Sequence, residues 1–162
     1  AQSKGFEFES TAQLTDDLMM TFNTSYTNSK LTEDNDAISG KKGDSMTMVP
    51  EWNGYLAFDQ GFEVMGKQAF IRADYTYYGE YKTHFNVRDE DVVPSYSYVN
   101  LSGRIELSDS VRLSVHLNNV FNTDAISYKR ARSRSEDNTT AQQYIDYLSE
   151  RNLTVRVDYT FF

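Results

Sequence analysis

The feature that most constrains the fold is an alternation of apolar and polar residues along seven segments. In one of them Ala69, Ile71 and Ala73 alternate with Arg72 and Asp74. Side chains of a β-strand point alternately to the two faces of a sheet, whereas a helix repeats every 3.6 residues. The pattern therefore predicts strands with one apolar and one polar face. They are expected at residues 6–14, 18–27, 52–59, 69–78, 99–107, 111–118 and 153–161.

The links between these predicted strands alternate in length. Three short links, 15–17, 61–67 and 108–110, alternate with three long polar stretches, 28–49, 79–95 and 122–151. Bacterial outer-membrane barrels have short periplasmic turns and long extracellular loops, and a tilted strand of about ten residues crosses a bilayer. A soluble sheet with one solvated face also alternates apolar and polar residues, but it gives no reason for this rhythm. We therefore expect an all-β chain, an antiparallel up-and-down meander of seven strands that is a fragment of a large transmembrane β-barrel.

Composition agrees with a strand-rich chain. The 162 residues include 12 Tyr and 10 Phe but only 2 Pro, which favours strands. The longest apolar run is about four residues, whereas a membrane-spanning helix needs about 20. The absence of Cys excludes disulfides and thiolate metal sites. The net charge of −8 argues against a nucleic-acid partner, which needs a basic surface.

The two predicted faces differ in charge. The apolar face carries no charged residue in any predicted strand, which suits contact with lipid. The polar face carries too many charges for the dry core of a small barrel. Either this face meets bulk water or it lines a wet lumen. We expect its charges on the concave side: Arg72, Asp74, Arg104, Glu106, Arg112, Arg156 and Asp158.

Five short motifs follow one another along the chain. They are Lys4-Gly5-Phe6-Glu7-Phe8-Glu9, Val49-Pro50-Glu51-Trp52-Asn53, Pro94-Ser95-Tyr96-Ser97-Tyr98-Val99-Asn100-Leu101, Leu117-Asn118-Asn119-Val120-Phe121-Asn122 and Tyr159-Thr160-Phe161-Phe162. Their order and spacing resemble the C-terminal part of the β-barrel of a TonB-dependent outer-membrane receptor. The fourth motif is the most specific of the five.

The resemblance implies a fold and a place in the cell. Such receptors are barrels of about 22 strands with a plugged lumen, so residues 1–162 would supply the C-terminal seven. The plug domain and the earlier strands would lie outside this chain. The implied location is the outer membrane of a Gram-negative bacterium. Tyr159, Phe161 and Phe162 would form the signal that the barrel-assembly machinery reads.

The resemblance also implies a function. The whole receptor would take up a scarce nutrient such as a ferric siderophore or cobalamin, energised through TonB. Its partners would be TonB, its own plug domain against the seven lumen charges, outer-membrane lipid and lipopolysaccharide. A passive porin, or a barrel with a structural or adhesive role, is the alternative.

The sequence offers little other chemistry. His84 and His116 are far apart and lack the spacing of metal ligands, so we expect no enzyme, no metal and no cofactor. A basic run lies in the last long stretch, at Lys129, Arg130, Arg132 and Arg134. It fits an anionic ferric chelate, lipopolysaccharide phosphates or a solvated loop equally well.

Overall fold

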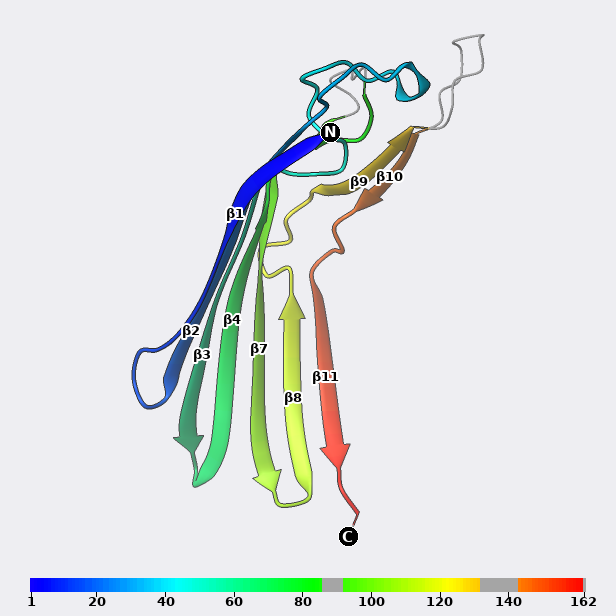
Figure 1. Ribbon diagram of the computed structural model, residues 1–162. Helices are drawn as coiled ribbons and strands as arrows, with labels where there is room; N and C mark the ends of the chain where they lie inside the picture. Colours follow the sequence, from blue (N-terminus) through cyan, green and yellow to red (C-terminus); the bar gives the residue numbers. More distant parts are fainter. Residues whose placement is uncertain (86–91, 132–142, 162) are drawn as a thin grey trace.

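The long strands of the chain form one antiparallel sheet (Figure 1). The computed structural model describes residues 1–85, 92–131 and 143–161. Each long strand pairs with the next one along the chain, so the predicted seven-stranded meander is confirmed. The strands are β1 (Gln2–Gln13), β2 (Leu18–Lys30), β3 (Trp52–Val64), β4 (Lys67–Tyr78), β7 (Tyr96–Ser108), β8 (Val111–Asn118) and β11 (Asn152–Tyr159).

The short turns lie at one end of the sheet and the long loops at the other (Figure 1). The loops, predicted from the sequence only as long polar stretches, contain elements of their own. These are a 3-10 turn η1 (Asp36–Ile38), the paired strands β5 (Tyr81–Lys82) and β6 (Val92–Val93), and the hairpin of β9 (Ile126–Ala131) and β10 (Gln143–Tyr147). No helix in the described ranges is long and apolar enough to cross a membrane.

Several predicted strand ends were wrong. The link expected over residues 61–67 is mostly strand, because β3 and β4 stay paired as far as Val64 and Lys67. Only Met65 and Gly66 form the turn, with φ of 52° and 74°. Two positive φ angles are typical of a type I′ turn, whose twist matches that of the flanking strands. At the loop end, β1 and β2 pair as far as Gln2 and Lys30, beyond the apolar part of the strands.

The sheet is a single layer with almost no core. It exposes 11350 Å², whereas a compact monomer of 18.7 kDa exposes about 8,300 Å². The buried hydrophobic residues among those described are Leu31, Ala57, Ala69 and Val93. Large apolar side chains such as Phe8 and Val157 are therefore exposed to solvent, at 51% and 65%.

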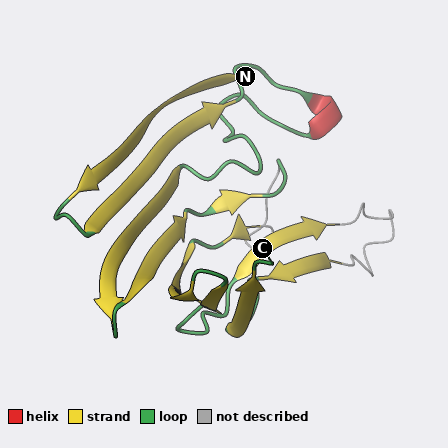
Figure 2. Ribbon diagram, turned by 90° about the horizontal axis from the view of Figure 1, so that it is seen from below, coloured by secondary structure: helices red, strands yellow, loops and turns green. Residues whose placement is uncertain are grey.

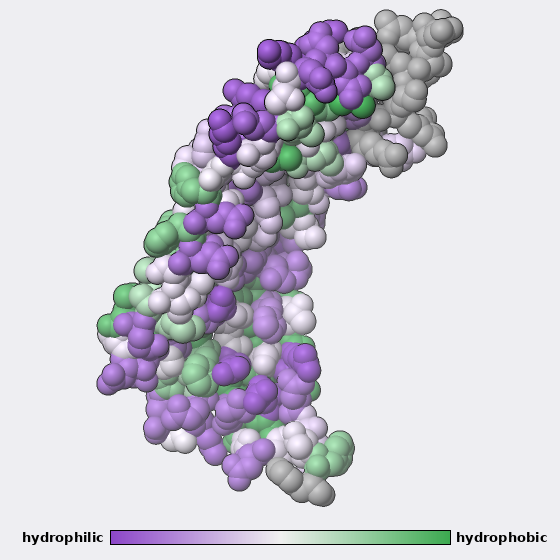
Figure 3. Space-filling model, in the orientation of Figure 1, coloured by the Kyte–Doolittle hydropathy of each residue, from purple (hydrophilic) through white to green (hydrophobic). Residues whose placement is uncertain are grey.

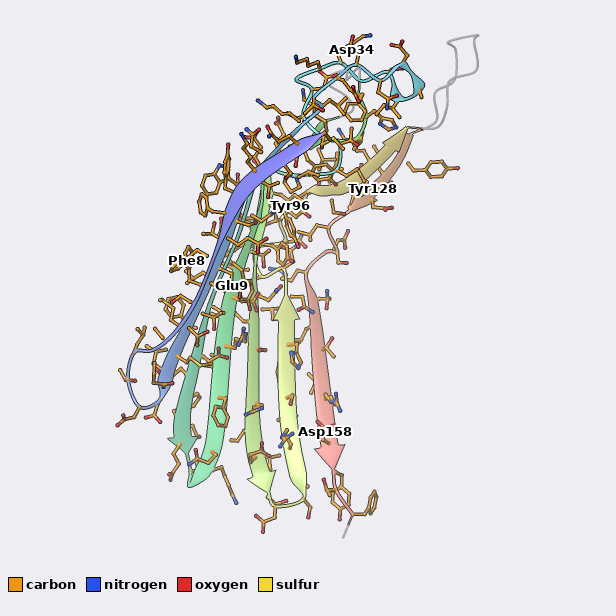
Figure 4. All side chains as sticks on the ribbon, viewed as in Figure 1. Phe8, Glu9, Asp34, Tyr96, Tyr128 and Asp158 are labelled. Atoms are coloured by element: carbon orange, nitrogen blue, oxygen red, sulfur yellow. The ribbon has the colours of Figure 1, made fainter. Side chains whose placement is uncertain are left out.

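The sheet is bent into an arc, seen along the strands in Figure 2. Phe8 lies outside the bend and Glu9 on its inner side (Figure 4). Since side chains alternate along each strand and the register aligns the strands, this pair fixes both faces. Glu9 is in register with Asn23, Tyr55, Thr76 and Tyr98. The concave face is thus the polar one and the convex face the apolar one.

Candidate functional site

Arg72 is the centre of the polar network on the concave face. It lies on β4 directly opposite Asp59 of β3. One guanidinium nitrogen donates to both carboxylate oxygens of Asp59, at 2.7 and 2.6 Å, and the other donates to the hydroxyl of Tyr55 at 2.7 Å. Asp59 and Tyr55 were not predicted as partners of Arg72, because only the register of two strands brings these residues together.

The acidic residues of the predicted set also have partners within the wall. Asp74 accepts a hydrogen bond of 2.9 Å from the side chain of Asn100, its neighbour in register. Glu106 accepts one of 2.7 Å from Arg112 across the β7–β8 hairpin. On the edge strand β11, Arg156 pairs with Asp158 at 2.7 Å. All six residues therefore stabilise one another or their neighbours on the same face.

Arg104 differs from the other predicted lumen residues. Its guanidinium lies 4.4 Å from the ring centroid of Phe70, in a cation–π contact. Within the described part of the chain it has no ion pair, and it is exposed. Of the seven predicted lumen residues, Arg104 is therefore the one whose positive charge is most available to a carboxylate outside the sheet.

The concave face is hollowed in two places with different chemistry. The hollow nearer the short turns has a volume of about 520 Å³ and is rich in arginine. Its charged and titratable lining is Asp59, Arg72, Arg104, Arg112, His116, Arg156 and Asp158. The hollow nearer the loops has a volume of about 390 Å³. It is lined by carboxylate, amide and phenol groups, including Glu7, Glu9, Asn23, Asn53, Tyr55, Tyr78 and Tyr98.

Asn53 contributes a polar atom without a partner to the lining of the loop-side hollow. Its side-chain oxygen Oδ1 is buried and has no hydrogen-bond partner in the part of the chain that the structure describes. A buried acceptor without a partner costs free energy. The polar lining of the hollow is therefore not fully hydrogen-bonded among the described residues.

The predicted basic cluster is only partly described. Lys129 lies on β9, and its ammonium group donates to the carbonyl of Val92 at 2.8 Å. The backbone of Arg130 pairs with Tyr144 in the β9–β10 hairpin. The side chain of Arg130, and the whole of Arg132 and Arg134, lie outside the described residues. The role of this cluster in substrate binding stays a prediction.

The long loops contact one another above the sheet. The backbone N–H of Met48 donates to the carbonyl of Lys82 at 2.7 Å, and the Tyr81 hydroxyl donates to the carbonyl of Ser127 at 2.9 Å. Burial raises the pKa of the Tyr81 phenol above its ordinary value. The three loops therefore share contacts instead of extending separately into solvent.

A network of charges orders the first long loop, where Figure 4 places Asp34. The backbone N–H of Lys42 donates to Asp34 at 2.8 Å and holds the pKa of that carboxyl below its usual range. Lys41 lies 3.2 Å from Asp36 and 3.4 Å from Asp34, and the hydrogen bond to Asp36 raises the pKa of Lys41. These groups are exposed, so the network orders the loop more than it stabilises the sheet.

Asn119 joins the loops to the sheet. It is 3% exposed, with a φ of 49°. Its side-chain amide donates to the carbonyls of Thr123 and Ser149 at 3.0 Å, and its oxygen accepts from the N–H of Thr123 at 2.8 Å. Its own backbone N–H donates to the side chain of Asn100 at 3.0 Å. The motif that is most specific in the sequence is thus a fixed corner where β8 enters the last long loop.

The chain ends in exposed aromatic residues. The rings of Tyr159 and Phe161 meet edge to face, with centroids 4.6 Å apart, and Phe161 is 85% exposed. Phe162 lies outside the described residues. Their role as an assembly signal stays a prediction.

The described residues offer no metal-binding geometry. No group of three or more His, Cys, Asp or Glu side chains there could hold a metal ion. His116 lies in the arginine-rich hollow and His84 among the loops, so the structure does not bring the two histidines together.

Solved structures with similar folds include receptors for siderophores. The ferric yersiniabactin uptake receptor FyuA from Yersinia pestis superposes with a TM-score of 0.81 at 12% identity, over 99% of this chain and 23% of that one. The ferric preacinetobactin receptor BauA from Acinetobacter baumannii gives 0.72 at 14% identity, over 97% and 22%. The siderophore receptor PiuA, also from Acinetobacter baumannii, gives 0.69 at 18% identity, over 97% and 21%. At these identities the likeness shows a common fold, and the chain spans less than a quarter of each receptor.

The family itself is shown by the sequence. A comparison with curated proteins finds no match. Residues 1–120, however, match the family described as "TonB dependent receptor-like, beta-barrel", and this range is well over half of the chain. The chain therefore belongs to the TonB-dependent receptor-like β-barrel family.

Proposed function

We propose that the chain is part of the wall of an outer-membrane receptor that takes up a scarce nutrient, energised through TonB. A ferric siderophore or cobalamin is the expected class of nutrient. The observation that carries the proposal is the family match of residues 1–120, on a sheet whose apolar convex face and one-sided loops suit a membrane barrel. The siderophores named for the similar receptors support the class without identifying the ligand.

We assign residues 1–162 to the C-terminal segment of such a barrel, as the order of the motifs predicts. In this arrangement the loop end faces the outside of the cell and the short turns face the periplasm. The segment supplies wall and extracellular loops and carries out no catalysis. The terminal aromatic residues would be read by the assembly machinery in the periplasm.

In this proposal the two hollows on the concave face have different roles. The loop-side hollow, with Glu7, Tyr78 and the unpartnered Asn53 oxygen, would face the incoming nutrient. The arginine-rich hollow would face the plug domain. Because most of its charges are paired within the wall, Arg104 is the residue we expect to contact a plug carboxylate.

The test is uptake by cells that carry the complete gene. Radiolabelled ferric siderophores and cobalamin would be offered to otherwise identical strains with and without TonB. Accumulation that needs TonB supports the proposal. Entry of small solutes that is independent of TonB and does not saturate would instead identify a passive porin, and no transport at all would favour a structural or adhesive barrel.

A further inference from the structure

Near the loop end of the β1–β2 hairpin, the convex face carries a cluster of aromatic residues. Phe6, Tyr26 and Trp52 lie side by side in register on β1, β2 and β3. Their ring centroids are 6.0 Å apart for Phe6 and Tyr26, 4.9 Å for Tyr26 and Trp52, and 5.8 Å for Phe6 and Trp52. Aromatic residues of this kind mark the boundary between hydrocarbon and headgroups. In the proposed orientation this aromatic cluster therefore lies at the outer surface of the membrane.

Two lysines lie beyond the aromatic cluster on the same face. Lys4 is two residues beyond Phe6, and Lys30 is four beyond Tyr26, so the period of two turns both side chains to the convex side. At about 3.4 Å per residue they lie about 7 Å and 14 Å beyond the cluster along the strands. Both are exposed, and neither has an ion pair within the described part of the chain.

Neutral hydrogen-bond donors complete this surface. Asn28 lies opposite Lys4 in register, and its side chain donates to the Tyr26 hydroxyl at 3.3 Å. Gln2 lies opposite Lys30. The only acidic residues of β1 and β2 are Glu7 and Glu9, and both point to the concave side. The chain has a net charge of −8, yet this patch presents cations and amide donors.

An apolar surface continues below the aromatic cluster. The rings of Phe8 and Phe22 lie 6.0 Å apart on the convex face, one step closer to the short turns. Figure 3 shows hydrophobic residues along the left margin of the sheet and hydrophilic ones gathered at the loop end. Cations beside an aromatic belt, with apolar rings beneath, match a lipid that has an anionic headgroup and acyl chains.

We infer that Lys4 and Lys30 bind a phosphate of lipid A, the anionic lipid anchor of lipopolysaccharide, on the outside of the barrel. The inference rests on the proposed placement of the loop end at the outer surface of the membrane. The lysines supply the charge, Asn28 and Gln2 add hydrogen bonds, and the Phe8–Phe22 surface contacts the acyl chains. A basic residue at an anionic membrane surface contributes about a fivefold gain in affinity.

Lys67 provides a matched control. It pairs with Val64 beside the short β3–β4 turn, so it lies on the same convex face at the opposite end of the sheet. It is exposed, as Lys4 and Lys30 are. The variant K67Q therefore removes the same charge from the same face, but away from the proposed site.

The experiment measures lipid binding to the complete receptor, purified in non-ionic detergent, by native mass spectrometry. The probes are lipid A with two phosphates, dephosphorylated lipid A and inorganic phosphate. We expect the double variant K4Q/K30Q to bind phosphorylated lipid A about 25-fold more weakly, and K67Q to bind it within about twofold of the wild type. Dephosphorylated lipid A should bind the wild type as weakly as phosphorylated lipid A binds the double variant.

Three results would overturn the inference. They are unchanged binding by K4Q/K30Q, an equal loss in K67Q, or binding of inorganic phosphate as tight as that of lipid A. Circular dichroism of each variant checks that the barrel is folded, which exposed Lys to Gln changes should preserve. TonB-dependent uptake measured on the same variants separates this site from the proposed function, since transport can persist when the lipid site is lost.

Discussion

At the scale of single residues, the neighbour across the strand decides what each charge on the concave face does. Arg72 donates hydrogen bonds both to Asp59 and to the hydroxyl of Tyr55, so its charge is held within the wall. Arg104 faces no acid and rests on Phe70 instead. Both residues have the same type and the same face, yet only one has charge available for a partner.

Arg72 and Asp59 should be coupled more strongly than Arg156 and Asp158. The side chains of the first pair are 36% and 29% exposed, and those of the second 70% and 35%. Exposed pairs are screened by water and contribute about 0–1 kcal/mol. We expect a coupling energy of about 1–2 kcal/mol for the first pair and less than about 0.5 kcal/mol for the second. Double-mutant cycles with R72Q/D59N and R156Q/D158N, followed by urea unfolding in detergent micelles, measure both. Equal coupling energies would contradict the expectation.

Asn119 should be needed for its side chain more than for its backbone angle. N119A removes the partner of the part-buried N–H of Thr123 and of the carbonyls of Thr123 and Ser149. A fully buried group left without a partner costs about 1–3 kcal/mol, and water can satisfy part of the loss at the exposed Ser149. N119G removes the same bonds but tolerates the positive φ. We therefore expect both variants to lower the unfolding free energy, with N119G recovering only the small backbone part. Full recovery in N119G would show that the φ angle alone matters.

At the scale of the strands, the sequence predicted which face of the sheet each residue occupies, but not where each strand begins and ends. The alternation of apolar and polar residues along β4 and β7 assigns each residue to one face of the sheet, because the apolar residues all belong on the same face. It cannot show how far two strands stay paired. The link was expected over residues 61–67, yet Phe62 and Val64 continue the outward phase of β3, and only Met65 and Gly66 turn.

The same limit applies to the loops and to the site. The β9–β10 hairpin carries polar and apolar residues on both faces, so no alternation marks it. The seven charges were expected to share a face, and register places them there, but their partners were not foreseen. In the sequence alone nothing distinguishes Asp59 and Asn100 from other polar residues. Strand pairing places Asp59 beside Arg72 and Asn100 beside Asp74.

The β3–β4 turn should respond in opposite directions to two substitutions. Gly66 has a φ of 74°, so G66A should lower the unfolding free energy by about 1 kcal/mol. Met65 has a φ of 52° and is 95% exposed, so it loses no packing when replaced. Since Asn adopts this conformation readily, M65N should raise the unfolding free energy by up to about 1 kcal/mol. Urea unfolding of both variants measures the signs, and a change in the same direction would argue against a type I′ turn.

The contact between the loops should weaken at high pH through Tyr81. Burial raises the pKa of its phenol above the ordinary 10.0. The contribution to stability is therefore complete below pH 10.0 and is lost as the pH rises through the folded-state pKa. An ionised Tyr81 can no longer donate to the carbonyl of Ser127. In an ultraviolet titration of the tyrosines, the Y81F variant should lack part of the absorbance change that the wild type shows above pH 10. If the missing change lay at or below pH 10, the raised pKa of Tyr81 would be contradicted.

At the scale of the whole molecule, the sheet is an open wall with two free edges. The strands β1 and β11 lie at opposite ends of the strand order. Each has a row of backbone N–H and C=O groups with no strand beside it in the described residues. Both run toward the short turns, so pairing them would make a parallel contact, which is not expected in bacterial single-chain barrels. The chain by itself thus has no antiparallel route to closure.

The isolated chain should therefore neither form a pore nor stay monomeric without detergent. In lipid each unpaired backbone group costs several kcal/mol, which is why membrane sheets are closed. In water the free edges stand beside an exposed apolar convex face, a combination that promotes association between chains. We expect no steady single-channel conductance when the purified 162-residue chain is added to planar bilayers. We also expect light scattering to show assemblies that dissolve when a mild detergent covers the convex face. Lasting unitary conductance, or a monomer in detergent-free buffer, would mean that the edges of β1 and β11 can close on each other after all.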